Sequence, residues 1–190
     1  MGCWGYGIME SDGAMDLECE FQDIAGVHPM GNIWRDPKVA QANRAAYEAA
    51  LPALFERARR EPVFEDQTQF RAEAFQVLTV TLMSVGCALS EAQRDELMAG
   101  LLNCYEYKFA KTLQSEAAAE GRSFTEADLI RHGIEPEYGG YAGMLERLYG
   151  RIDAIEALAT RLREYPIGGG LQVETPTQGL FDVMLTRSQQ

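Results

Sequence analysis

The sequence predicts a mainly α protein, a single-domain bundle of about six helices over residues 1–190. Two observations support this prediction. Apolar residues recur at steps of three and four along most of the chain, which is the helical period. Residues that cap or break helices stand at the ends of these periodic stretches. An irregular glycine- and aromatic-rich stretch, residues 1–11, precedes the helices, and a short tail, residues 166–190, follows them.

The first predicted helix covers residues 12–25 and is acidic. Asp12 is expected at its N-cap, where a carboxylate accepts the free N–H groups of the first turn. Asp16 follows one turn later on the same face. Gly26 is expected to end the helix, because glycine readily takes the left-handed conformation found there.

Two further helices are predicted before residue 90. Asp36-Pro37 is a favourable start for the second, with aspartate as the cap and proline at the first helical position. Pro52 predicts a kink or a junction of two helices near Leu51. The third helix is expected to end near Leu89; its last part is apolar all round and β-branched, which leaves a buried strand as an alternative.

The fourth predicted helix begins with a capping-box pattern formed by Ser90 and Gln93. It is expected to run through the alanine triplet at 117–119 and to stop at Gly121. The residues at helical spacing that define its inner face are Leu97, Leu101, Cys104, Tyr105, Phe109 and Leu113.

The last two helices carry the clearest signals. Thr125 and Asp128 predict the start of a short helix over 126–132, closed by Gly133. The final helix is long, and Pro166 and the glycines after it end it. Its apolar residues advance at helical spacing through Tyr141, Leu145, Leu148, Ile152, Ile155, Leu158 and Leu162.

Composition limits the classes of partner. The formal net charge of -12 argues against direct contact with nucleic acid, because phosphate binding needs clustered Lys and Arg. A protein with a basic surface is the expected partner. No C-x-x-C spacing or signal peptide is present, and the longest apolar run, Val77–Leu89, is too short to span a bilayer. These features predict a cytoplasmic protein without contact to a membrane.

The residue patterns of common catalytic sites are missing, so the prediction is a protein without catalytic residues, resident metal or cofactor. Only His28 and His132 could serve as imidazole bases, and neither lies near a nucleophile motif. The glycine-rich stretches lack the Lys-Ser/Thr ending of a phosphate loop. One enzymatic alternative stays open, in which Glu10, Asp12 and Asp16 hold a divalent cation.

Acidic and aromatic residues on two predicted helices are the candidate contacts with a partner. Glu18, Glu20 and Asp23 come from the first helix, and Glu116 and Glu120 come from the end of the fourth. Their carboxylates would meet basic side chains of the partner. Tyr107 is added because it lies off the apolar stripe of its helix, and tyrosine is frequent in protein interfaces.

The first 16 residues carry a recognisable signature. They read Met1-Gly2-Cys3-Trp4-Gly5-Tyr6-Gly7, followed after a short gap by Asp12-Gly13-Ala14-Met15-Asp16. This pattern resembles the opening of a bacterial and phage domain family of unknown function. The resemblance implies a small prokaryotic or phage accessory protein, and it implies a structural role for Trp4, Gly5, Gly7, Asp12 and Asp16.

The sequence therefore predicts a non-enzymatic acidic protein that inhibits a partner by occluding it. Its acidic surface would mimic nucleic acid and block a basic groove, as phage-encoded inhibitors of host defence such as anti-CRISPR proteins do. Two alternatives remain at this stage. One is an immunity protein that neutralises a basic toxin, and the other is the carboxylate- and metal-dependent enzyme.

Overall fold

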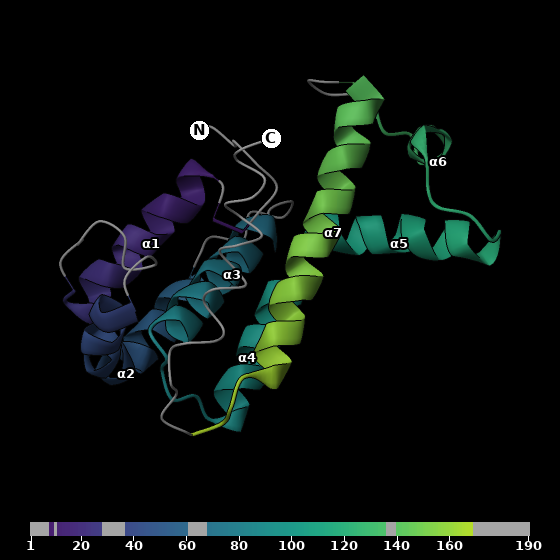
Figure 1. Ribbon diagram of the computed structural model, residues 1–190. Helices are drawn as coiled ribbons and strands as arrows, with labels where there is room; N and C mark the ends of the chain where they lie inside the picture. The colour runs from purple at the N-terminus through teal and green to yellow at the C-terminus, as the bar shows by residue number, and fades with distance from the viewer. Residues whose placement is uncertain (1–7, 10, 28–36, 61–67, 136–139, 169–190) are drawn as a thin grey trace.

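The chain is all α in the computed structural model, which describes residues 8–9, 11–27, 37–60, 68–135 and 140–168. The side chains of residues 12, 37–42 and 68–70 are also outside this description. Within the described ranges the helices pack as a single bundle (Figure 1). They are α1 (Asp12–Ala25), α2 (Pro37–Arg60), α3 (Thr68–Ser84), α4 (Glu91–Leu102), α5 (Tyr105–Ala119), α6 (Glu126–Arg131) and α7 (Gly140–Glu164).

Helix α1 has the predicted bounds but a different cap. Ser11 is the N-cap residue, and its hydroxyl accepts a hydrogen bond from the backbone N–H of Ala14 at 3.0 Å. The expectation that Asp12 caps the helix is wrong by one position, since Asp12 is already its first helical residue. Gly26 ends the helix at φ 67°, as predicted, and the buried Val27 donates back to Gln22 at 2.9 Å.

Helix α2 passes through Pro52 as one element, so of the two predicted alternatives the junction of two helices is wrong, and the kink stays a prediction. A proline removes one hydrogen bond from the helical ladder but leaves its neighbours in place. Leu51 and Leu54, on either side of Pro52, are both buried and belong to the same apolar face. Burial of this face holds the helix together across the proline.

The third predicted element is a helix, α3, and not the buried strand that was the alternative. It ends at Ser84 and not near Leu89. Gly86 takes a φ of 73°, and its N–H bonds to the carbonyl of Met83 at 3.1 Å. The left-handed glycine therefore ends the helix within a stretch that stays apolar and buried. Leu89 then forms an isolated parallel bridge with Ile167, which follows α7.

The predicted fourth helix is divided into α4 and α5 by Asn103 and Cys104. Tyr105 starts α5 and is 59% exposed, so its placement on an inner face is wrong. Each half keeps the helical period by itself, which is why the pattern runs through the break. The halves differ in what they cover, because α4 and α5 contribute to different hydrophobic clusters.

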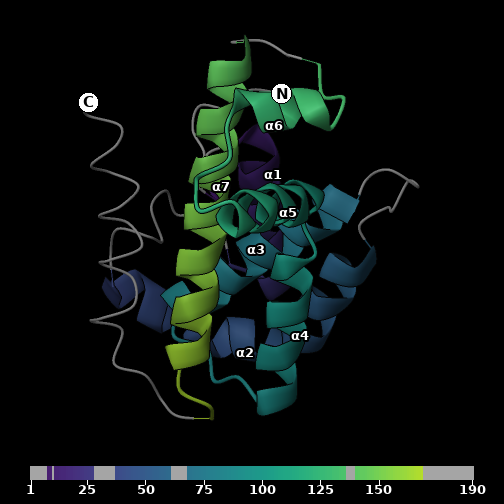
Figure 2. The ribbon, with the colours of Figure 1, turned by 90° about the vertical axis from the view of Figure 1, so that its right-hand side faces the viewer.

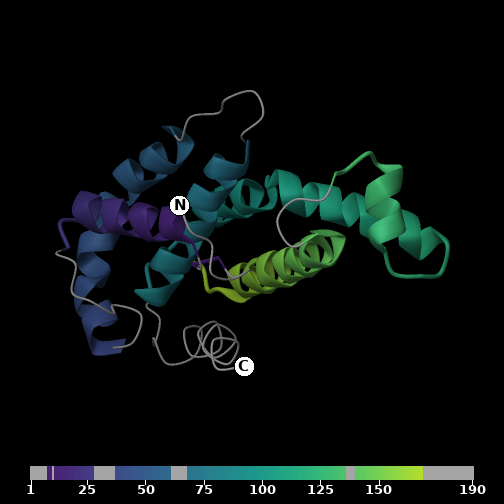
Figure 3. The ribbon, with the colours of Figure 1, turned by 90° about the horizontal axis from the view of Figure 1, so that it is seen from above.

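The two clusters define two regions that share α7. We call the first the body: helices α1–α4 together with the C-terminal half of α7 from Ile155 onward. We call the second the arm: α5, α6 and the N-terminal half of α7 from Met144 to Ile152. Figures 1 and 3 show α5 and α6 projecting away from the other helices to one side. Among the described helices, none is long and apolar enough to cross a membrane.

Candidate protein-binding face

The outer side of α1 is the strongest candidate for a binding surface. Ala14, Leu17 and Phe21 are buried in the body. Because the helix has 3.6 residues per turn, a different set of side chains lies on the opposite side and faces solvent. We call this set the α1 face; all its members are exposed, and they are Met15, Asp16, Cys19, Glu20 and Asp23.

Two carboxylates of the α1 face have no ion-pair partner among the described residues. Asp16 and Asp23 are exposed and seven positions apart, about 10 Å along the helix axis. Glu20 differs, because it accepts a hydrogen bond from Arg57 of α2 at 2.7 Å. Glu18, beside the face and half-buried, accepts one from the Gln22 amide at 2.9 Å.

Acidic side chains surround the thiol of Cys19. Partial burial raises the pKa of its thiol, and the negative charges of Glu18, Asp16 and Asp23 raise that pKa further. α1 contains no Lys or Arg, and Arg57 of α2 pairs with Glu20 of this face. The thiol thus lies in a region of negative potential at the centre of an exposed helix face.

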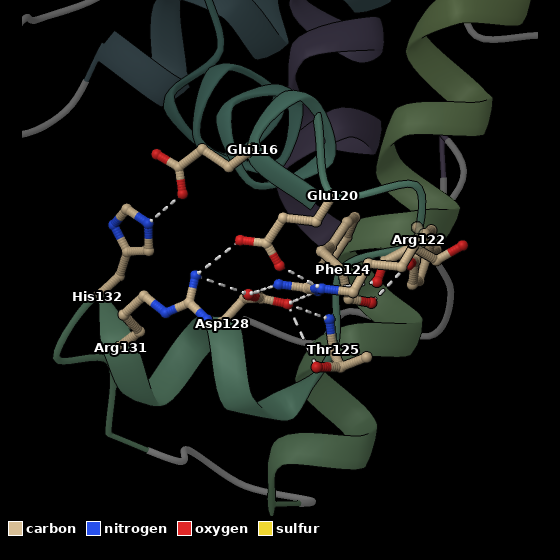
Figure 4. Close-up of polar contacts among 10 residues, drawn as sticks. Glu116, Glu120, Arg122, Phe124, Thr125, Asp128, Arg131 and His132 are labelled. Atoms are coloured by element: carbon tan, nitrogen blue, oxygen red, sulfur yellow. Dashed lines mark hydrogen bonds and ion pairs between the residues drawn. The ribbon is translucent and has the colours of Figure 1, made fainter. Parts of the chain in front are cut away.

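The acids predicted on the arm are engaged within the molecule (Figure 4). Glu116 lies 2.8 Å from Nε2 of His132. Glu120 accepts from Arg122 at 2.8 Å and lies 3.7 Å from Arg131. Both carboxylates therefore fasten the end of α5 to α6 and the loop before it.

Asp128 is the centre of this network and was not singled out as a site residue. Its buried carboxylate receives two hydrogen bonds from Arg122, at 2.6 and 2.7 Å, and one from the backbone N–H of Thr125 at 2.8 Å. These bonds hold the pKa of Asp128 well below its usual range, with the Arg122 guanidinium as the main cause. The capping-box pattern in the sequence marked Asp128 as a helix start, but not its pairing with Arg122.

Tyr107 lies where the two regions meet. It is half-buried and packs against both hydrophobic clusters. Burial, followed by the charge of Glu156, raises the pKa of its phenol. Much of the ring is therefore occupied in joining the arm to the body, and its role in binding a partner stays a prediction.

The structure separates the two groups of predicted acidic contacts. Glu18, Glu20 and Asp23 lie on α1, whereas Glu116 and Glu120 lie near the far end of α5. Figures 1 and 3 place α1 and this end of α5 on opposite sides of the molecule. They form two separate surfaces. Among these described residues Asp23 has no ion-pair partner, whereas Glu20, Glu116 and Glu120 each have one.

Several predicted residues cannot be placed. Trp4, Gly5, Gly7, Glu10 and His28 lie outside the described residues. Of the remaining signature positions, Asp12 is described only in its backbone, and Asp16 belongs to the α1 face. Among the described side chains, no three His, Cys, Asp or Glu residues are arranged to hold a metal ion.

Comparisons with known proteins identify no relative of this chain. No family model, no curated protein and no solved structure matches it. Any function must therefore be inferred from the geometry and charge of the molecule itself.

Proposed function

We propose that this chain is a non-enzymatic binding protein that uses the α1 face to occlude a basic surface on a protein partner. The observation that supports this most is the pair Asp16 and Asp23, exposed on one helix face without an ion-pair partner among the described residues. Carboxylates that already have a cation gain little from a second one. Unpaired carboxylates attract basic groups over about 10 Å at moderate salt.

The α1 face also has an apolar edge that such an interface needs. Met15 is 50% exposed beside the acids, and methionine adapts its shape to varied partner surfaces. Charge would guide the approach of a basic partner, and burial of Met15 would slow its dissociation. The partner class that fits is a protein with Lys and Arg around a small apolar pocket.

Proteins that bind nucleic acid have such basic surfaces, so occlusion would inhibit them. We propose this setting for the chain: an inhibitor encoded by a phage or bacterium, of the anti-defence type, that acts in the cytoplasm. No family model matches the chain, so this setting rests on the negative charge of the α1 face.

The test is affinity capture from a nuclease-treated bacterial lysate with two matched double variants. Asp16→Asn/Asp23→Asn removes two unpaired charges from the α1 face, and Glu116→Gln/Glu120→Gln removes two paired charges from the arm. The first variant is expected to capture at least about tenfold less of a basic protein than wild type does, because each lost ion contact in an interface weakens binding. The second is expected to retain that protein.

Equal capture by wild type and Asp16→Asn/Asp23→Asn would contradict the proposal. Equal losses in both variants would also contradict it, because total charge alone would then explain binding. Circular dichroism of each variant confirms that its helices are intact before capture is compared.

A further inference from the structure

A second exposed stripe runs along α5 and is independent of the α1 face. Its members are spaced by 4, 3 and 4 residues, which places them on one side of the helix. We call it the α5 stripe; it consists of Tyr105, Phe109, Thr112 and Glu116. Phe109 is half-buried and the other three are exposed. Figure 2 shows α5 nearly end-on, in front of α3 and between α4 and α6.

The aromatic side chains of the α5 stripe are held in place by one another. The rings of Tyr105 and Phe109 are stacked, with centroids 6.2 Å apart and planes 3° apart. The ring of His132 meets Phe109 edge-on at 5.8 Å and bonds to Glu116 at 2.8 Å. A rigid exposed tyrosine offers a large contact area at little cost in conformational entropy.

The negative charges near the α5 stripe are partly neutralised within the chain. Two copies of a chain with net charge -12 repel each other over most of their surfaces. On the arm, however, Glu120 is paired with Arg122 and Arg131, and Glu116 is hydrogen-bonded to the ring of His132. A second copy can therefore approach this surface against less repulsion than it meets at the α1 face.

The spacing of the α5 stripe is symmetric about its middle, between Phe109 and Thr112. If two α5 helices lie antiparallel about a two-fold axis at that point, Phe109 of each copy faces Thr112 of the other, and Tyr105 faces Glu116. Glu116 uses only its Oε2 atom for His132. Its Oε1 atom is then available to accept a hydrogen bond from the Tyr105 hydroxyl of the second copy.

We propose that the chain forms a symmetric homodimer through the α5 stripe, with Tyr105 of each copy paired to Glu116 of the other. The same patch on both copies makes the contact, as expected of a two-fold interface. The arrangement leaves the α1 faces on the two outer sides of the dimer, because α1 and α5 lie in different regions of the chain.

Sedimentation velocity over a range of protein concentrations tests this dimer. Two variants of Tyr105 are compared that carry opposite charges at this position. Tyr105→Glu places a carboxylate opposite Glu116 and is expected to weaken self-association at least about tenfold, as for an interface hot spot. Tyr105→Lys removes the same ring but places a cation opposite Glu116, so it is expected to dimerise more tightly than Tyr105→Glu. Met15→Glu is the matched control, since Met15 is 50% exposed on the body and Tyr105 is 59% exposed.

Cross-linking tests the same contact without disturbing Tyr105. Thr112→Cys, in a chain in which Cys3 and the exposed Cys19 are changed to Ser, is expected to link two copies with a short bismaleimide. A wild-type monomer at all concentrations would overturn the proposal. It would also be overturned by equal dimerisation of the Glu and Lys variants at Tyr105, or by failure of Thr112→Cys to cross-link in a sample that sediments as a dimer.

Discussion

The body and the arm hold their helices together in different ways. The body buries large side chains such as Phe21, Leu54 and Leu82 completely, and it leaves the acids Asp16 and Asp23 without ion pairs among the described residues. The arm has a smaller hydrophobic cluster, and it uses its acids to tie α5, the following loop and α6 together. Ion pairs also join helices of the body, such as Glu20 with Arg57 and Glu96 with Arg59, but these acids are not buried, whereas the carboxylate of Asp128 is buried in the arm.

This difference explains why net charge alone is a poor guide to a binding surface. Both regions contributed acids to the predicted contacts, and their side chains are equally charged in the sequence. The structure distinguishes them by their partners: Glu120 faces two arginines, whereas Asp23 faces solvent. The acids available for a partner are those that folding has left unpaired.

The largest expected effect tests whether the close packing of α3 on α4 stabilises the body. Gly100 of α4 packs against Phe75 of α3, and a Cβ atom added at Gly100 would lie 2.2 Å from the ring. Because Phe75 is buried, we expect Gly100→Ala to lower the free energy of unfolding by about 1–3 kcal/mol, measured by urea denaturation.

The control is Gly13→Ala, because Gly13 also lies in a helix but a Cβ atom added there would lie 3.8 Å from the side chain of Glu73. This is an ordinary contact distance, so the variant is expected to be as stable as wild type or up to about 1 kcal/mol more stable. If Gly100→Ala were no less stable than wild type, close packing of α3 on α4 would not be what holds the body.

The next effect tests whether charge holds the arm together. Asp128→Asn removes the carboxylate that pairs with Arg122, and hydrogen exchange is expected to become faster in α6 while α2 and α3 are unchanged. The pKa of Asp128 is lowered in the folded chain, so its stabilisation is complete above the ordinary Asp pKa of about 4. That stabilisation is lost as the pH falls below this value.

The difference in α6 exchange between wild type and Asp128→Asn should therefore shrink in acid. Exchange measured from neutral pH down to about pH 2 checks this expectation. A difference that stayed constant over this range would show that the Asp128 carboxylate does not stabilise the arm through its charge.

The smallest effect concerns an acid that folding does not use. Asp23 lies in the last turn of α1, where the helix dipole is negative and where no basic residue occurs. Asp23→Asn is therefore expected to raise the free energy of unfolding by about 0.3–1 kcal/mol, measured by urea denaturation. A clear loss of stability would show that Asp23 has a structural partner.

Most of the fold was predictable from local signals. The capping boxes at Ser90 and Thr125 and the left-handed Gly26 stand at the predicted helix ends. The break between α4 and α5 was not predictable, because Asn103 and Cys104 include neither glycine nor proline and both flanking helices keep the same period. The position of this break depends on which hydrophobic cluster each helix packs against, and this is a property of the tertiary structure.

The candidate site was predictable only in part. The acidic character of α1 follows from its sequence, but the pairing of Glu20 with Arg57 joins residues 37 positions apart. No local pattern reveals such a pair. Arg122 and Asp128 lie close in sequence, yet their bidentate contact depends on the loop conformation before α6.

The most direct test of the negative potential on the α1 face uses Cys19 as a probe in a Cys3→Ser chain. Cys87 and Cys104 are buried, so Cys19 is the exposed thiol among the described cysteines. Its rate of reaction is compared between a cationic and an anionic methanethiosulfonate reagent. The ratio of the two rates cancels the effect of the raised thiol pKa and isolates the local potential.

We predict that the cationic reagent reacts faster at low salt and that high salt removes this preference. Asp16→Asn/Asp23→Asn should reduce the ratio, and Glu116→Gln/Glu120→Gln should leave it unchanged. Equal rates for both reagents in the wild-type chain, or equal reductions in both double variants, would contradict the account that the unpaired acids of α1 form the binding face.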